Sequence, residues 1–160
     1  MEPAILDTQA VFDKFPDEPA LNALSDLAVA AKYDREELTV TVARENIRAA
    51  CEAVKAAGYT FLEDVTAVDW YPSEPRFQIS YSILSFSLKR RLRLVVRLAG
   101  DDAAIDSITG IWPSANFYER EVFDLFGVHF GGHPNLRRIM MPEDWQGHPL
   151  RKDYPVEGYR

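Results

Sequence analysis

Charged side chains that can act as acids, bases or ion-pair partners are concentrated around residue 120. A helical period of about 3.6 residues predicts a helix over residues 117–126. On that helix Glu119 falls within an apolar arc, and the other charged residues lie opposite: Arg120, Glu121 and Asp124. A carboxylate at an apolar surface needs a proton or a cation, because an unpaired buried charge is costly. We expect a structural ion pair rather than a general acid, with three arginines as available partners: Arg137, Arg138 and Arg151.

The ends of this predicted helix carry signals of their own. Asn116 followed three residues later by Glu119 resembles a capping box, and Gly127 is a typical residue beyond a helix C-terminus. Arg120 and Asp124 are four residues apart and can pair on the polar side. Phe117 also falls on that side, and an exposed aromatic ring beside charges is typical of protein interfaces.

All three histidines lie after this helix, which raises the alternative of a metal site or a hydrolase. His129 and His133 are four apart, but two glycines between them disfavour the helix that would align their rings. No glutamate lies between them to act as the base of a zinc protease. His133 and His148 each precede a proline, a position where imidazole often bonds to backbone. We therefore favour structural histidines over a metal hydrolase and expect no metal in this chain.

The upstream sequence predicts an α+β domain in which helices pack on a small, mostly antiparallel sheet. Apolar periodicity indicates helices over residues 18–32, 43–58 and 103–108. Alternating or β-branched runs indicate strands over residues 38–42, 59–70, 76–84 and 91–98, the last two forming a hairpin. Cys51 lies on an apolar helix stripe and is expected to be a packed thiol.

Residues 127–160 differ in character from the rest. They contain four prolines and five glycines, yet also many large apolar residues interleaved with Arg137, Arg138, Arg151 and Lys152. Proline this frequent excludes a long helix, and disordered tails hold far less apolar material. We therefore divide the chain into a globular domain (1–126) and an extended, irregular C-terminal arm (127–160) that docks on another subunit.

Composition limits the remaining possibilities. The formal net charge of −7 argues against nucleic acid as a partner. The N-terminus lacks the order of a signal or transit peptide, and no apolar run approaches the roughly 20 residues of a membrane helix. The single cysteine excludes an internal disulfide. We expect a cytosolic chain that meets a membrane only through a partner.

Two sequence blocks resemble one known family. The first is ERE at 119–121, DLF at 124–126, His133 and Pro134, then Arg137 and RIM at 138–140; the second is GHPLRKDYPVEGY at 147–159. They are similar to the motifs of the 30 kDa or C subunit (the J subunit in chloroplasts and cyanobacteria) of proton-translocating NADH-quinone oxidoreductase, respiratory complex I. Phe117 stands where members usually carry tryptophan. The resemblance implies motif and interface roles for Phe117, Glu119, Arg120, Glu121, Asp124, His133, Pro134, Arg137, Arg138, His148, Arg151, Lys152 and Asp153.

The resemblance also implies a function. The 30 kDa subunit is a hydrophilic part of the peripheral arm, on the cytoplasmic side of the bacterial inner membrane. It carries no cofactor, since the iron–sulfur clusters, FMN and quinone belong to partners, and no catalytic residue is expected in this chain. Its expected neighbours are the D subunit and the terminal iron–sulfur subunit, with which it supports the quinone-reducing module and coupled proton translocation. Hydrogenase-type membrane complexes use a homologous subunit, so they remain an alternative.

Overall fold

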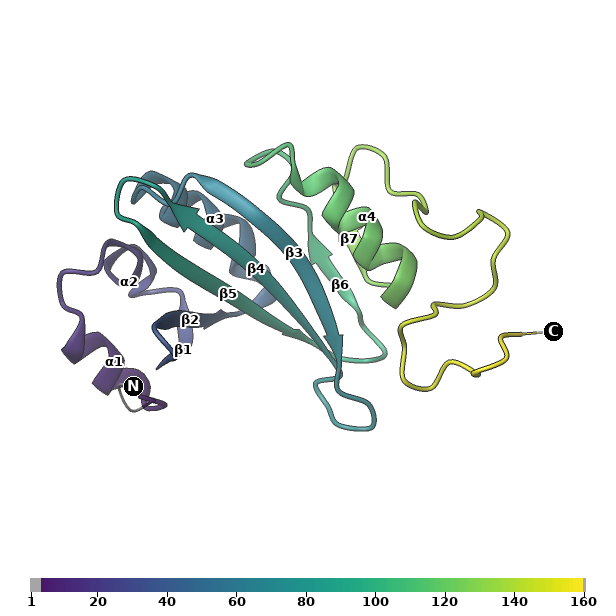
Figure 1. Cartoon of the computed structure of the whole chain (residues 1–160), viewed down its shortest axis with the longest axis horizontal. Coiled ribbons are helices and arrows are strands. Elements are labelled where there is room, and N and C mark those ends of the chain that lie inside the picture. The colour runs from purple at the N-terminus through teal and green to yellow at the C-terminus, as the bar shows by residue number, and fades with distance from the viewer. Residues whose placement is uncertain (1–3, 160) are drawn as a thin grey trace.

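A computed structural model describes residues 4–159 (Figure 1). The helices are α1 (Thr8–Lys14), α2 (Pro19–Leu24), the short 3-10 helix η1 (Arg44–Asn46), α3 (Ile47–Ala56) and α4 (Ala115–Phe126). The strands are β1 (Ala28–Asp34), β2 (Glu37–Val42), β3 (Phe61–Asp69), β4 (Phe77–Ser85), β5 (Arg90–Leu98), β6 (Ala104–Asp106) and β7 (His129–Gly131).

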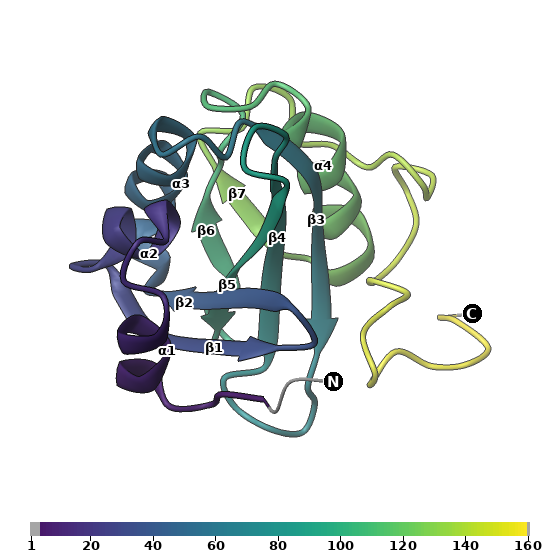
Figure 2. The same ribbon diagram turned by 60° about the vertical axis from the view of Figure 1, so that its left-hand side comes forward.

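Five strands form the main sheet in the order β1-β2-β5-β4-β3, antiparallel except where β2 runs parallel to β5. Alternation places one side of β4 in the core through Phe77, Ile79, Tyr81 and Ile83, as period-two patterning requires. Helices α2 and α3, the two-stranded sheet β6-β7 and α4 contribute to the same core. Figure 2 shows α1, α2 and α3 on one side of the molecule and α4 on the other. The predicted α+β class with a mostly antiparallel sheet is confirmed.

Most predicted elements are present near their expected positions. Helix α3 matches the prediction for residues 43–58, and Cys51 on its apolar stripe is fully buried. The predicted β4–β5 hairpin is present, with Phe77 opposite Leu98. A bulge in β3 lies between Leu62 and Asp64, where the polar residues had indicated a bend.

Two predicted helices are wrong. The helix expected over residues 18–32 ends at Leu24, and β1 begins at Ala28. Arg35 and Glu36, both at positive φ, form a two-residue turn that lets β1 pair with β2, so sheet pairing overrides the helical preference of the alanines. The helix expected over residues 103–108 is instead β6, which pairs in parallel with β7.

Beyond β7, residues 132–159 contain neither helix nor strand; we call them the C-terminal segment. The boundary we predicted, after residue 126, precedes β7, which still belongs to the folded domain. Figure 1 shows the C-terminal segment (yellow-green to yellow) running from near the N-terminal end of α4 along the outer side of the helix. Within residues 4–159, no helix is both long and apolar enough to cross a membrane.

Candidate functional site

Helix α4 buries three charged side chains, although it lies at the edge of the domain: Glu119, Arg120 and Asp124. It begins at Ala115 after Ser114, which makes no side-chain cap, so the predicted capping box at Asn116 is wrong. It ends as predicted at Gly127, whose φ of 74° is the left-handed conformation that glycine adopts without strain. These three side chains bond α4 to the loop that follows β6 and to the C-terminal segment.

Glu119 lies in the apolar surroundings that its position on the helix predicted, with no exposed surface. Its partners, however, are not arginines. The Ser107 hydroxyl donates to it at 2.6 Å and the Ile108 N–H at 2.8 Å. Burial raises the pKa of Glu119 to about 7, although these two hydrogen bonds act in the opposite direction. The predicted Glu–Arg pair is therefore wrong, because the loop after β6 reaches this carboxyl first.

His133 fixes the start of the C-terminal segment against α4. The Asn135 N–H donates to its Nδ1 at 3.0 Å, so the ring proton lies on Nε2, which donates to the Asn116 carbonyl at 3.1 Å. The same Nε2 lies 3.9 Å from a Glu119 oxygen. The predicted backbone bonding of His133 is confirmed, while Pro134 beside it is exposed.

Asp124 holds the middle of the C-terminal segment. One carboxylate oxygen accepts three consecutive backbone N–H groups, from Ile139, Met140 and Met141, at 2.9, 2.7 and 2.9 Å. The other accepts from the Arg138 guanidinium at 2.8 Å. Burial alone would raise the pKa of Asp124, but these four bonds outweigh it and lower the pKa. The predicted pairing of Asp124 with Arg120 is wrong, because the C-terminal segment covers the face of α4 that appeared polar.

The side chain of Arg120 bonds to the backbone of the same C-terminal segment. Its guanidinium donates to the Arg137 carbonyl at 3.1 Å and to the Arg138 carbonyl at 3.2 Å. Its charged group also lies 5.9 Å from the ring centre of Phe117, within the range of a cation–π contact. The side chain of Arg137 itself stays exposed, as does Glu121 on the helix.

The carbonyls at the C-terminal end of α4, which have no partner within the helix, are bonded by the second sequence block. Nδ1 of His148 lies 2.9 Å from the Asp124 carbonyl, and Arg151 donates to the Phe126 carbonyl at 2.6 Å. The Leu150 N–H donates to the Leu125 carbonyl at 3.0 Å. Burial lowers the pKa values of both His148 and Arg151.

A further ion-pair cluster, which the sequence did not predict, connects the C-terminal segment to the main sheet. Buried Arg76, which precedes β4, pairs with Asp69 at the end of β3 at 2.8 Å and with Asp153 at 2.6 Å. The Lys152 N–H also donates to Asp69 at 2.8 Å. Burial works against ionisation of Asp69, yet these bonds lower its pKa to about 2. No local pattern relates residues 76 and 153, so only the folded chain brings them together.

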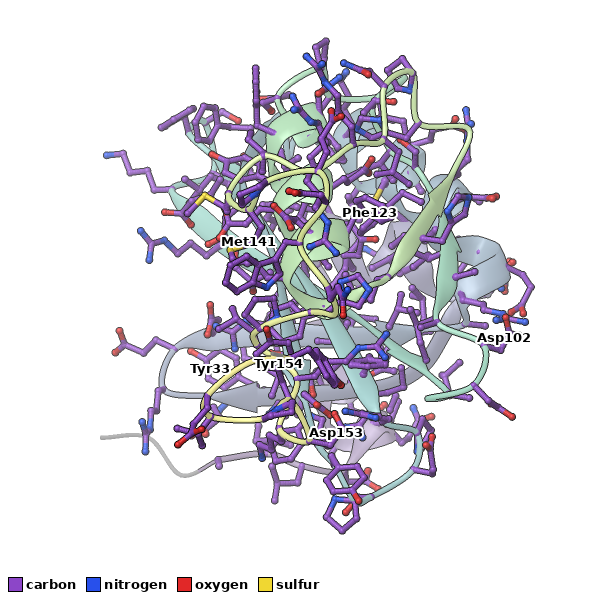
Figure 3. All side chains as sticks on the ribbon, turned by 90° about the vertical axis from the view of Figure 1, so that its right-hand side faces the viewer. Tyr33, Asp102, Phe123, Met141, Asp153 and Tyr154 are labelled. Carbon is purple, nitrogen blue, oxygen red and sulfur yellow. The ribbon has the colours of Figure 1, made fainter. Side chains whose placement is uncertain are left out.

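The outward surface of the site is rich in apolar side chains. Figure 3 views the molecule from this side, where the C-terminal segment crosses in front of α4, with Met141 and Tyr154 along it. Large exposed residues here are Phe117, Ile139, Met140, Trp145, Leu150, Val156 and Tyr159. Met140 is 63% exposed and Leu150 51%. Large apolar side chains, aromatic ones and methionine among them, are enriched in protein-binding surfaces.

The histidines do not assemble a metal centre within the part of the chain that the structure describes. There, residues 4–159 hold no group of three or more His, Cys, Asp or Glu side chains placed to bind an ion. His129 is exposed on β7, whereas His133 and His148 bond to backbone atoms at opposite ends of α4.

Comparison with known proteins supplies the context of this site. Residues 40–160 match the profile of the family described as respiratory-chain NADH dehydrogenase, 30 kDa subunit. The chain is 49% identical over 138 residues to the C subunit of NADH-quinone oxidoreductase from Citrifermentans bemidjiense, covering 86% of this chain and 83% of that protein. It is 51% identical over 126 residues to the protein of the same name from Geobacter sulfurreducens, covering 78% of each.

Two solved structures share the fold. A trypsin-resistant fragment of Nqo5 aligns with a TM-score of 0.59 at 35% identity, over 62% of this chain and 83% of the fragment. A chain of the membrane-bound sulfane sulfur reductase, an archaeal respiratory membrane complex, aligns with a TM-score of 0.76 at 28% identity, over 88% and 86%. The sequence motifs, the fold and these matches together show that the chain belongs to the family of the 30 kDa subunit of respiratory-chain NADH dehydrogenase, as the resemblance implied.

Proposed function

We propose that this chain is a structural subunit, without a cofactor of its own, of the peripheral arm of an NADH-quinone oxidoreductase. One observation carries the proposal: in the C-terminal segment some polar side chains bond inward to α4, while several large apolar side chains are left exposed. Arg138 is tied to Asp124, whereas Met140 and Leu150 are mostly exposed. A free-standing segment of a soluble protein has the opposite arrangement, because apolar surface is stabilised by leaving water. The outward face thus suits a partner surface.

The neighbours we propose follow from the family resemblance: the D subunit and the terminal iron–sulfur subunit, on the cytoplasmic side of a bacterial inner membrane. In this role the chain makes and breaks no bond. Its ion pairs hold the C-terminal segment in one conformation before docking, so less conformational entropy is lost when the complex forms. The chain thereby supports the quinone-reducing module, and with it coupled proton translocation, while the iron–sulfur clusters, FMN and quinone reside on partners.

A second candidate is the equivalent subunit of a different respiratory membrane complex. The structural similarity to a chain of the archaeal sulfane sulfur reductase complex favours it. Identity supports the first candidate, since it is 49% to the Citrifermentans bemidjiense protein and 28% to the chain of the archaeal complex. The other subunits recovered with the chain distinguish the two, because only the first predicts an NADH-oxidising complex.

The proposal can be tested by tagging the chain in its native host and purifying it under conditions that preserve membrane complexes. Wild type should recover redox subunits, and the double variant Met140→Asp/Leu150→Asp should recover few of them. Phe86→Asp is the matched control, because Phe86 is also exposed but lies in the β4–β5 turn. Equal recovery by the double variant and wild type would contradict the docking role of the segment.

The absence of a cofactor needs its own measurement. The purified chain alone should show no visible absorption from flavin or iron–sulfur clusters, and metal analysis should find no stoichiometric zinc or iron. A bound metal together with hydrolytic activity would instead support the alternative of a histidine-dependent metal hydrolase.

A further inference from the structure

A cavity of about 450 Å³ lies within the C-terminal segment, away from the contacts with α4. Three aromatic side chains, Trp145, Tyr154 and Tyr159, line it together with the carboxylates Asp144 and Glu157. We call these five residues the aromatic cup. None of the described residues that line this cavity is a lysine or an arginine.

The rings of the cup are held in place by contacts with one another and with glycine. The Trp145 indole N–H donates to the Tyr154 hydroxyl at 3.1 Å. The rings of Tyr154 and Tyr159 meet edge to face, with centres 5.4 Å apart and planes at 88°. Both rings also lie close over Gly147, where a Cβ would come within 2.9 Å of Tyr154 and 2.7 Å of Tyr159. The polar atoms of Trp145 and Tyr154 thus bond to each other, which leaves ring surface to face the cavity.

The charges around the cup favour a cation. Aromatic faces attract cations through the ring quadrupole, and carboxylates at the same cavity add ordinary charge attraction. Two of the three arginines within residues 132–159 are engaged elsewhere, and the third, Arg137, is exposed. Arg138 bonds to Asp124 and the Gly147 carbonyl, and Arg151 bonds to the Phe126 carbonyl.

We infer that the aromatic cup receives an arginine side chain presented by a neighbouring protein subunit. The identity of that subunit rests on the proposed function. A guanidinium fits better than an ammonium, because its planar group stacks on a ring while its N–H groups bond to a carboxylate. The partially exposed rings of Trp145 and Tyr159, at 41% and 58%, are covered when that side chain enters. The cup supplies a polar, directional contact within an otherwise apolar docking surface.

A titration of the full chain tests the cup without any other subunit. The probe is the peptide Gly-Gly-Arg-Gly-Gly, compared with the same peptide carrying citrulline, the uncharged analogue of arginine. Binding is followed by NMR through the three indole N–H signals, with that of Trp145 assigned by Trp145→Phe. The arginine peptide should shift the Trp145 signal in a saturable manner, whereas the citrulline peptide should not.

Variants identify the groups that bind. Asp144→Asn and Tyr159→Leu should each weaken the arginine peptide by about two- to fivefold, the size expected for one exposed cation–π or charge contact. Glu143→Gln and Phe86→Leu are matched controls outside the cup and should leave affinity unchanged. The inference would be overturned if the citrulline peptide bound as tightly as the arginine peptide, or if the two cup variants bound the arginine peptide as tightly as wild type does.

A photo-crosslinker placed at Gln146, which lines the same cavity but is not one of the five cup residues, then separates this inference from the proposed function in the native complex. Crosslinks to an arginine-bearing segment of a copurified subunit support both. If the redox complex is recovered but the crosslinks map to segments without arginine, the assignment of the cup fails and the docking role stands. If no complex is recovered, the docking role fails and with it the subunit origin of the arginine.

Discussion

Replacing Asp124 by asparagine should detach the middle of the C-terminal segment while leaving the domain folded. The carboxylate accepts three backbone N–H groups on one oxygen and Arg138 on the other. An asparagine amide has only one oxygen. Whichever side the oxygen faces, the NH₂ group must face a donor, either the Arg138 guanidinium or the N–H groups of residues 139–141.

The size of the effect follows from the burial of this pair. The Asp124 side chain has no exposed surface and that of Arg138 is 14% exposed. Breaking a buried ion pair by removing one partner costs about 3–5 kcal/mol. We take about 3 kcal/mol, because part of the segment can rehydrate when it opens. That free energy raises the population of the detached form about 100-fold.

Hydrogen exchange measures this directly. The amides of Ile139, Met140 and Met141 should exchange about 100-fold faster in Asp124→Asn, while those of the β4 core keep their wild-type rates. Glu121→Gln is the matched control, since Glu121 is an exposed acid on the same helix. Unchanged exchange at residues 139–141 in a folded Asp124→Asn protein would refute the role assigned to this carboxylate.

The same contact predicts a dependence on pH. The pKa of Asp124 is lowered in the folded chain, so its contribution is complete above 3.8, the ordinary aspartate value, and is lost as the pH falls through the folded value. Acid should therefore speed exchange at residues 139–141 in wild type beyond the intrinsic pH effect. The Asn variant should lack this additional change.

Three further predictions concern stability. The raised pKa of Glu119 means that the folded chain binds the carboxyl proton more tightly than the unfolded chain does. The free energy of unfolding of wild type should therefore fall by about 3 kcal/mol relative to that of Glu119→Gln as the pH rises from 4.5 to about 7. Denaturant unfolding at several pH values measures this difference, and a difference that does not vary with pH would disprove the prediction. Gly127→Ala should destabilise the fold more than Gly132→Ala, as measured by thermal unfolding. Both glycines have positive φ near 75°, so both variants share a conformational cost of about 1 kcal/mol. Only at residue 127 would the added Cβ approach side-chain atoms at 2.6 Å. Arg76→Lys should loosen residues 152–154 in hydrogen exchange, because an ammonium cannot reproduce the forked bonds to two aspartates, and equal protection would contradict that.

Sequence periodicity predicted the domain well where one element has one buried face. The stripe of α3, the alternation of β4 and β5 and the glycine after α4 were all correct, because each is decided by local spacing. Residues 28–34 and 104–106 were assigned wrongly because they become strands only through pairing, with β2 across a two-residue turn and with the distant β7. Short alanine-rich or mixed stretches fit a helix and a strand equally, and only tertiary pairing decides between them.

The site was predicted in outline but not in its pairings. Spacing correctly placed Glu119 against the apolar side of α4, but it could not show that Ser107 would reach the carboxyl. Asp124 was assigned to a solvated face because a helical wheel contains no information on what covers each face. Here the chain returns after residue 131 and buries that face, which turns a predicted surface charge into the main anchor of the C-terminal segment.

The parallel pairing of β6 with β7 has a consequence for the rigidity of α4. Parallel neighbours cannot be joined by a tight turn, and α4 is the crossover that connects them. The helix ends only two residues before β7, whereas residues 107–114 separate its start from β6. Adding or deleting a single residue within α4 would rotate the anchoring side chains before that point by about 100° relative to those after it. The contacts of Asn116 and Asp124 with the C-terminal segment therefore depend on an unchanged helix between them.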